Sequence, residues 1–192
     1  MQISINANRC EPSPMRKFHP LAVAAKKEGK KIYHLNIGQP DLPTPEAYYE
    51  AIHAFADRTL EYEASPGRPE LIGAVKKYYA DLGVELEDND VLITTGGSEA
   101  LLFTCLSILD PYTEVIIPEP YYPNYTTFVH AAGGVIRALP TNPWEGYRYA
   151  DRKRIESLIT PNTRAIMITN PGNPDALRGL RTQIDLVGGI LG

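Results

Sequence analysis

Short apolar runs alternate along the chain with longer segments in which apolar residues recur at helical spacing. Runs typical of buried strands cover Ile32–Gly38, Val91–Thr95, Glu114–Pro118, Val135–Pro140 and Arg164–Thr169. Segments of helical spacing cover Pro20–Glu28, the stretches after Thr44 and after Pro69, Ser98–Asp110, the stretch before Gly133, and Asp151–Ile159. This alternation predicts an α/β fold with a mostly parallel, doubly wound sheet.

A proline-rich stretch ends where one of these helices is expected to begin. Thr44 is placed to cap the helix, with Pro45 at its first position. Tyr48, Ile52 and Phe55 then lie at i, i+4 and i+7, so the pattern predicts a stripe that faces the core.

The next helix is expected to start at Pro69 and to end at Gly83, since both residues are typical of those positions. Its predicted buried side consists of Leu71, Ile72, Val75, Tyr79 and Leu82.

Composition and charge narrow the classes of function. The chain has 192 residues, 43% of them hydrophobic, and a net charge of -4 without a basic block, so no nucleic-acid surface is indicated. No apolar run approaches the roughly 18 residues of a membrane span, and no export signal is visible. Cys10 and Cys105 lie far apart, which favours neither a disulfide framework nor a metal site. We therefore expect a cytoplasmic protein whose partners are small molecules or further copies of itself.

Three segments follow strand-like runs and are the candidates for chemistry. Ligands of open α/β sheets bind outside the carboxyl ends of the strands. The segments after Val91–Thr95, Glu114–Pro118 and Arg164–Thr169 are Gly96–Glu99, Glu119–Tyr125 and Asn170–Asp175. If the strands are parallel, all three segments lie along one edge of the sheet.

Each segment supports a binding role and a purely structural one. Gly96 and Gly97 allow a close backbone approach at a helix start, which suits an anion together with Ser98, or they form a tight turn with a serine cap. The tyrosines of "PEPYYPNY" offer a stacking face for a flat ligand or ordinary packing. The asparagines of "NPGNP" offer an amide donor or an ordinary turn.

The segment Gly96–Ala100 also approaches the G-x-S-x-G elbow of serine hydrolases, with Ser98 as nucleophile and an alanine in place of the last glycine. His130 is the one histidine that follows Ser98, and it lies inside a predicted helix. A hydrolase is therefore a distant alternative.

Taken in order, the motifs resemble the class I and II aminotransferases that depend on pyridoxal 5'-phosphate, of fold type I and similar to aspartate aminotransferases. "TTGGSEAL" is similar to the family's phosphate-binding segment, which implies that the amides of Gly97 and Ser98 hold the phosphate. "PYYPNY" implies that Tyr122 stacks on the cofactor ring, and "NPGNP" that Asn173 donates a hydrogen bond to the cofactor's phenolic oxygen.

Two earlier motifs belong to the same resemblance. "NIGQPDLPTP" implies that Gly38 lies beside the substrate carboxylate. "YEASPGRPELIGAV" implies that Tyr62 reaches the cofactor phosphate of the neighbouring subunit in a homodimer. The substrates implied are an amino acid, with aspartate as the candidate, and a 2-oxo acid.

The resemblance also implies an architecture. Residues 1–44 would form an N-terminal arm and small-domain segment, and residues 45–192 part of a three-layer α/β/α cofactor-binding large domain. Residues 175–192 depart from the family pattern, with Asp175 and Ala176 where the family favours Thr-Gly. The helical spacing of Leu180, Ile184, Val187 and Leu191 in this tail is interrupted by Gly188-Gly189.

The lysine that forms the Schiff base with the cofactor has no counterpart in this sequence. All eight lysines precede Asn173, and none lies in the family's context. We therefore assign no catalytic residue and expect a chain that corresponds to the amino-terminal half of an aminotransferase, truncated or frameshifted and inactive alone. A non-catalytic remnant that binds the cofactor or a partner is the alternative.

Overall fold

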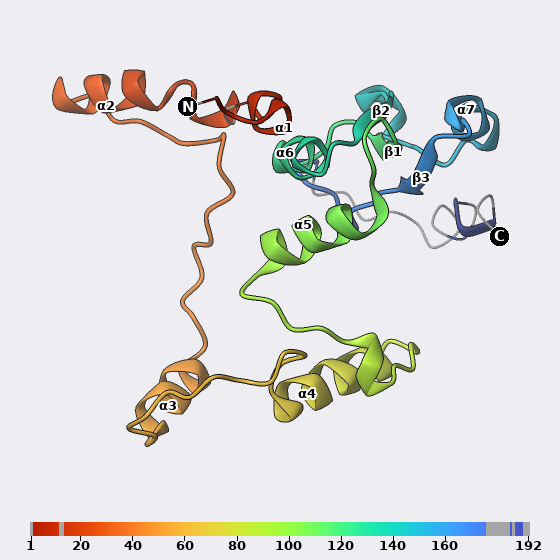
Figure 1. Cartoon of the computed structure of the whole chain (residues 1–192). Coiled ribbons are helices and arrows are strands. Elements are labelled where there is room, and N and C mark those ends of the chain that lie inside the picture. Colours follow the sequence, from red (N-terminus) through yellow and green to blue (C-terminus); the bar gives the residue numbers. More distant parts are fainter. Residues whose placement is uncertain (1, 12–13, 176–184, 186, 190–192) are drawn as a thin grey trace. The chain divides into compact units, whose positions relative to one another are not determined.

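The computed structural model describes residues 2–11, 14–175, 185 and 187–189 (Figure 1). Contacts divide the chain into two compact units. The sheet unit comprises residues 1–16 and 96–192, and the helical unit comprises residues 17–95. The domain division at residue 44 that the sequence suggests refers to the intact family fold and stays a prediction.

Three parallel strands form the centre of the sheet unit, in the order β2-β1-β3. The strands are β1 (Glu114–Pro118), β2 (Val135–Leu139) and β3 (Thr163–Ile166). β1 pairs with β2 along its whole length, from Glu114 opposite Val135 to Pro118 opposite Leu139. It pairs with β3 through Ile116, with an irregularity after Glu114. The expectation of a parallel α/β sheet is confirmed.

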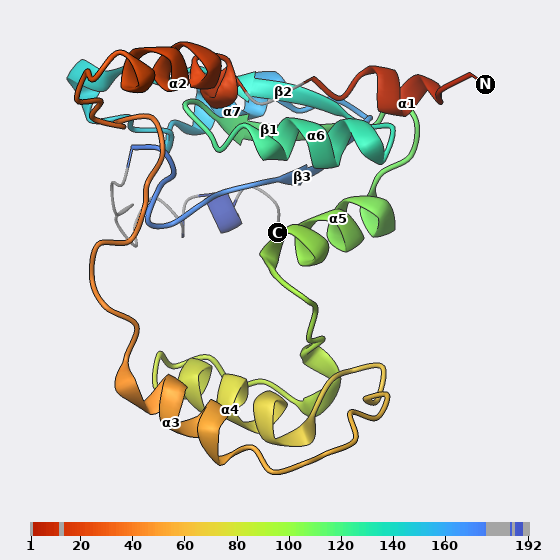
Figure 2. The ribbon, with the colours of Figure 1, turned by 90° about the vertical axis from the view of Figure 1, so that its left-hand side faces the viewer.

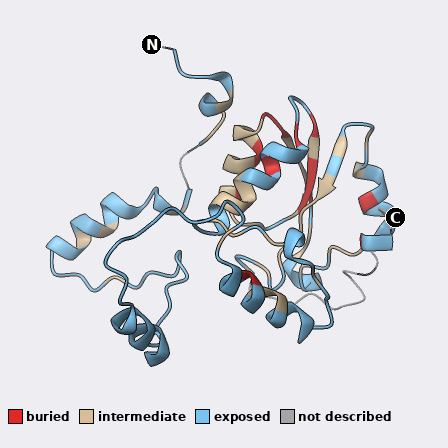
Figure 3. Cartoon of the chain, turned by 60° about the horizontal axis from the view of Figure 1, so that its bottom comes forward, coloured by how far each residue is buried: buried red, intermediate tan, exposed pale blue. Residues whose placement is uncertain are grey.

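Helices cover both faces of this sheet. Helices α5 (Gly97–Ile108) and α6 (Asn124–Ala131) lie on one face, and α7 (Arg152–Leu158) lies on the other. One buried cluster contains Cys105, Leu109, Val115, Ile117, Tyr125 and Val129, and the second contains Ile116, Leu139, Ile155 and Val187. Successive side chains of β1 thus enter opposite layers, which explains its continuous apolar run. Figure 3 shows burial concentrated on the strands and on helix faces of this unit.

Two runs expected to be strands form no ladder. Ile32–Gly38 and Val91–Thr95 are without regular structure, although Val91 has extended torsion angles of -120° and 121°. The amide of Ile93 donates at 2.9 Å to the carbonyl of Pro66, a residue that lies in a turn and not in a strand. The prediction was wrong because an apolar run becomes a strand only when a neighbouring strand accepts its hydrogen bonds.

The helical unit contains α2 (His19–Lys27), α3 (Glu46–Ala54) and α4 (Pro69–Ala80) (Figure 2). Short 3-10 helices cover Asp88–Asp90 in this unit, and Pro14–Arg16 and Pro143–Glu145 in the sheet unit. α4 begins at Pro69 as expected, and Gly83 adopts a positive φ of 81° just beyond its end. Sequence signals therefore located this helix well.

The start of α3 and the burial of both helix faces differ from expectation. Pro45, rather than Thr44, is the N-cap residue of α3, and no side chain bonds to the cap. The stripe of Tyr48, Ile52 and Phe55 is at least half exposed. On α4, Ile72 is buried, Val75 is half-buried, and Leu71 and Tyr79 are exposed. Leu82 lies beyond the end of the helix and is also exposed. These apolar faces were predicted from spacing, but the described residues provide no layer that covers them.

The first described residues dock on the sheet unit. The short helix α1 (Ile5–Asn8) is followed by Arg9, whose guanidinium donates to the carbonyls of Gly133 at 3.3 Å and Gly134 at 2.9 Å. The ring of His130 is 3.0 Å from the Arg9 carbonyl. Because these carbonyls follow the end of α6, the positive charge also lies at the favourable end of the helix dipole.

Gly67 is a position at which the backbone requires glycine. Its φ is 109°, and a Cβ there would lie 2.5 Å from Cβ of Ile93. We expect Gly67→Ala to destabilise the helical unit by more than about 2 kcal/mol, because strain and overlap add. Gly73→Ala is the matched control: it lies inside α4 with open space around it, and should stabilise the helix by about 0.5–1 kcal/mol. Urea unfolding followed by circular dichroism measures the free energy of unfolding of both variants, which should change in opposite directions. A change of the same sign and size in both would contradict the prediction.

The Arg9 contacts predict a measurable contribution to stability. Arg9→Ala should lower the free energy of unfolding of the sheet unit by about 1.5–3 kcal/mol, because charged hydrogen bonds to partly buried carbonyls are lost. Arg152→Ala, which breaks an exposed pair with Glu156, should cost at most about 0.5 kcal/mol. Denaturant unfolding of both variants measures the two losses in free energy of unfolding. Similar losses would show that the N-terminal segment does not dock on the sheet unit through Arg9.

Candidate functional site

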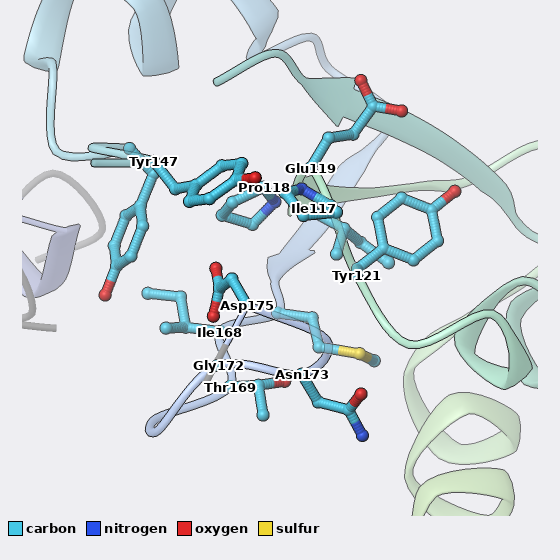
Figure 4. Close-up of a pocket in the computed structure, with 13 residues that line it drawn as sticks. Ile117, Pro118, Glu119, Tyr121, Tyr147, Ile168, Thr169, Gly172, Asn173 and Asp175 are labelled. Atoms are coloured by element: carbon cyan, nitrogen blue, oxygen red, sulfur yellow. The ribbon is translucent and has the colours of Figure 1, made fainter. Parts of the chain in front are cut away.

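The segments that follow β1 and β3 line one pocket at the carboxyl edge of the sheet (Figure 4). The pocket and its open mouth enclose about 370 Å³. Residues 117–121 form one side and residues 167–169 with 172, 173 and 175 form another, while Tyr147 and Tyr149 come from the segment after β2. The parallel strands bring these loops together, so the expectation of one shared edge holds for the second and third segments.

Asn173 lies in the wall of this pocket and is exposed. In Figure 4 its amide group points away from the carboxylate of Asp175. An exposed side-chain amide in a proline-stiffened loop can donate to a phenolic or carbonyl oxygen of a ligand. The position of Asn173 is therefore compatible with the donor role that the resemblance implies.

Tyr122 follows the lining residue Tyr121 but is not among the residues that line the pocket, and it belongs to a cluster of three tyrosines. It is half-buried, and its hydroxyl accepts a hydrogen bond from the side chain of Asn124 at 2.8 Å. Its ring meets Tyr125 edge to face at 5.6 Å, and Tyr121 stacks on Tyr125 at 6.5 Å. Tyr125 belongs to the core, so packing explains that tyrosine, whereas Tyr122 is partly buried at the margin of the same cluster.

The start of α5 has the features of an anion cradle. Gly97 and Ser98 are exposed, and a Cβ added at Gly97 would meet no atom within 4 Å. At the start of the helix, the amides of Glu99 and Ala100 donate to the carbonyl of Gly96. The amides of Gly97 and Ser98 precede these bonds, and with the helix dipole they suit a phosphate group. Neither residue lines the pocket of Asn173 among the described residues.

Tyr149 also lines the pocket, although no sequence motif indicated it as a site residue. Its hydroxyl is buried and has no hydrogen-bond partner within the described part of the chain, and its side chain lines the same pocket as Asp175. Burial raises the pKa of Tyr149, and the negative charge of Asp175 raises it further. The only sequence signal was the close spacing of Tyr147 and Tyr149 after a strand.

The remaining candidates lie elsewhere. Gly38 and Tyr62 belong to the helical unit, and both are exposed. Tyr62 is completely exposed and lines an open pocket together with Arg58 and Arg68. The ring nitrogen Nδ1 of His130 lies 3.0 Å from the carbonyl oxygen of Arg9, and within the described part of the chain no hydrogen bond joins His130 to Ser98. Nothing in the described residues therefore supports the hydrolase alternative.

The departing tail is only partly visible. Leu180, Ile184 and Leu191 lie outside the described residues, whereas Val187 is helical and buried against the layer of α7. No group of three potential metal ligands occurs in residues 2–11, 14–175, 185 and 187–189. A search of the same residues gives no helix of sufficient length and apolar character to cross a membrane.

Comparison with known proteins gives consistent matches. The family model of aminotransferase class I and II matches residues 30–178. A probable aspartate/prephenate aminotransferase of Thermus aquaticus is 35% identical over 174 residues, which cover 90% of this chain and 45% of that protein. A probable aspartate aminotransferase of Streptomyces griseus is 32% identical, covering 80% of this chain and 72% of that relative.

Solved structures agree with the sequence matches. A single mutant of the aspartate aminotransferase of Thermus thermophilus is similar with a TM-score of 0.92 and 30% identity. The match covers 99% of this chain and 50% of that one. The chain thus spans about half the length of the first relatives that it matches.

The environment of Tyr149 predicts an unusual titration. The absorbance difference between the wild type and Tyr149→Phe should show a phenol that ionises above the usual value of about 10. The raised pKa of Tyr149 in the folded protein stabilises the fold fully below about pH 10, where the unfolded chain also keeps this phenol protonated. This contribution is lost as the pH rises from about 10 through the pKa of the folded protein, and Tyr149→Phe should lessen that loss. Asp175→Asn should lower the midpoint by removing the nearby charge. A midpoint at or below 10 would contradict the buried environment.

Proposed function

Because the chain belongs to the aminotransferase class I and II family, whose members depend on pyridoxal 5'-phosphate, we propose that it supplies the cofactor-binding part of an aminotransferase. The observation that supports this most strongly is the pocket in which the loops after β1 and β3 meet and which Asn173 lines. The proposed reaction transfers an amino group between an amino acid, with aspartate as the candidate, and a 2-oxo acid.

Each loop has a separate role in this proposal. The amides of Gly97 and Ser98 bind the phosphate at the start of α5, where open space and the helix dipole favour an anion. The ring of Tyr122, which is partly buried, stacks on the cofactor ring, and Asn173 donates to the phenolic oxygen. When bound, the cofactor serves as the electron sink of the reaction, while the protein binds and orients it.

The helical unit would contribute to the site through an assembly. We propose that Gly38 lies beside the substrate carboxylate and that Tyr62 reaches the phosphate of a neighbouring subunit, as the resemblance implies. The complete exposure of Tyr62 in the single chain is compatible with such a role. A homodimer in the cytoplasm is therefore part of the proposal, in keeping with the two distant cysteines.

The chain alone is proposed to bind the cofactor without turnover. Its eight lysines all precede Asn173, and none lies in the context of the family's catalytic lysine. A remnant that only binds the cofactor makes the same prediction for this chain. The two proposals differ for a protein that also contains the other half of the family's length, since only the aminotransferase would then transfer amino groups.

A binding titration with pyridoxamine 5'-phosphate tests the proposed site. This amine carries the same phosphate, ring and phenolic oxygen but cannot form adducts with the exposed lysines. Asn173→Ala and Tyr122→Ala should each weaken binding about tenfold, because a hydrogen bond to a charged oxygen or a stacking contact contributes about 1.5 kcal/mol.

Two surface variants control for general effects of substitution. Asn162→Ala changes an exposed loop asparagine, and Tyr78→Ala changes an exposed tyrosine on α4. Both should bind the ligand as the wild type does. Equal affinity in all five proteins, or no saturable binding to the wild type, would overturn the proposed site.

A further inference from the structure

A pair of hydroxyl groups connects the two segments that carry Tyr122 and Asn173. The hydroxyl oxygens of Tyr125, on α6, and Thr169, after β3, lie 2.7 Å apart. We propose that Tyr125 is a positioning residue that sets the spacing between the ring of Tyr122 and the amide of Asn173. This inference rests on the proposed function, because it concerns the same cofactor site.

The ring of Tyr125 is fixed by the core. It is 8% exposed and packs in the cluster formed by α5, α6 and β1, next to Val129 and Ile117. A buried phenol needs a partner for its hydroxyl, and Thr169 provides one. The hydroxyl is therefore held at the edge of the sheet by a ring that cannot easily move.

Tyr125 also constrains Tyr122 directly. The two rings meet at 84° with their centres 5.6 Å apart, and the amide of Tyr125 donates to the carbonyl of Tyr122 at 3.0 Å. Asn124 holds the hydroxyl of Tyr122 from the other end. The orientation of Tyr122 is thus determined by contacts within one segment, and that segment is fastened to the core through Tyr125.

Thr169 extends the connection to the second loop. It lies in the pocket wall and precedes Asn173 by four residues in the same short segment. A shift of Thr169 relative to Tyr125 would move the loop of Asn173 relative to Tyr122. Core packing alone would be satisfied by phenylalanine, so the hydroxyl has a use that is separate from filling the core.

The test compares the full chain with variants that remove only this hydroxyl pair. Tyr125→Phe keeps the ring and Thr169→Val keeps the volume, and each should weaken the binding of pyridoxamine 5'-phosphate about three- to tenfold. The double variant should be no weaker than the single ones, because both remove the same bond. Thr169→Ser should bind as the wild type does, and so should Tyr112→Phe, which changes an exposed tyrosine.

A readout without ligand separates positioning from general stability and from the proposed function. In Tyr125→Phe, NMR resonances of the Tyr122 ring and the Asn173 side-chain amide should both shift, while the urea midpoint changes little. Shifts of this kind support the inference even if the wild type binds no ligand, an outcome that would overturn the proposed site alone. Unchanged resonances at both residues would overturn the positioning role, as would a Tyr125→Phe variant with wild-type affinity when Asn173→Ala binds weakly.

Discussion

The pairing of β1 with a parallel strand on each side is the interaction on which the rest of the sheet unit depends. Val115, Ile116 and Ile117 are almost completely buried and send alternate side chains into the two helical layers. Parallel pairing fixes the direction of all three strands, so their carboxyl ends share one edge. The loops of that edge are then free to carry polar and aromatic groups, because the strands and helices already supply the core.

Local sequence signals were sufficient where an element forms its contacts within the same unit. The boundaries of β1 matched the expected run, and Pro69 marked the start of α4. The run of Val91–Thr95 has the composition of a strand but is not assigned to one, and the described residues provide no layer that covers the stripe of α3. Periodicity states which face is apolar, but it does not state what will cover that face.

The candidate site shows the same division. Motifs indicated Asn173 and the start of α5 as candidates, because the chemistry proposed for them depends on the local backbone. The hydrogen bond between Tyr125 and Thr169 joins two residues that are far apart in the sequence. The hydroxyl of Tyr149 is likewise buried by residues from other parts of the chain. Such contacts depend on the register of the sheet and on the path of each loop, which single-sequence patterns do not encode.

The central claim is that loops from separate strands and from the start of α5 act as one cofactor site. The most direct measurement is an NMR map of the wild-type chain during addition of pyridoxamine 5'-phosphate. The account predicts saturable shifts that occur together at the amides of Gly97 and Ser98, the ring of Tyr122 and the side chain of Asn173. Shifts confined to one of these segments, or found only elsewhere in the chain, would contradict it.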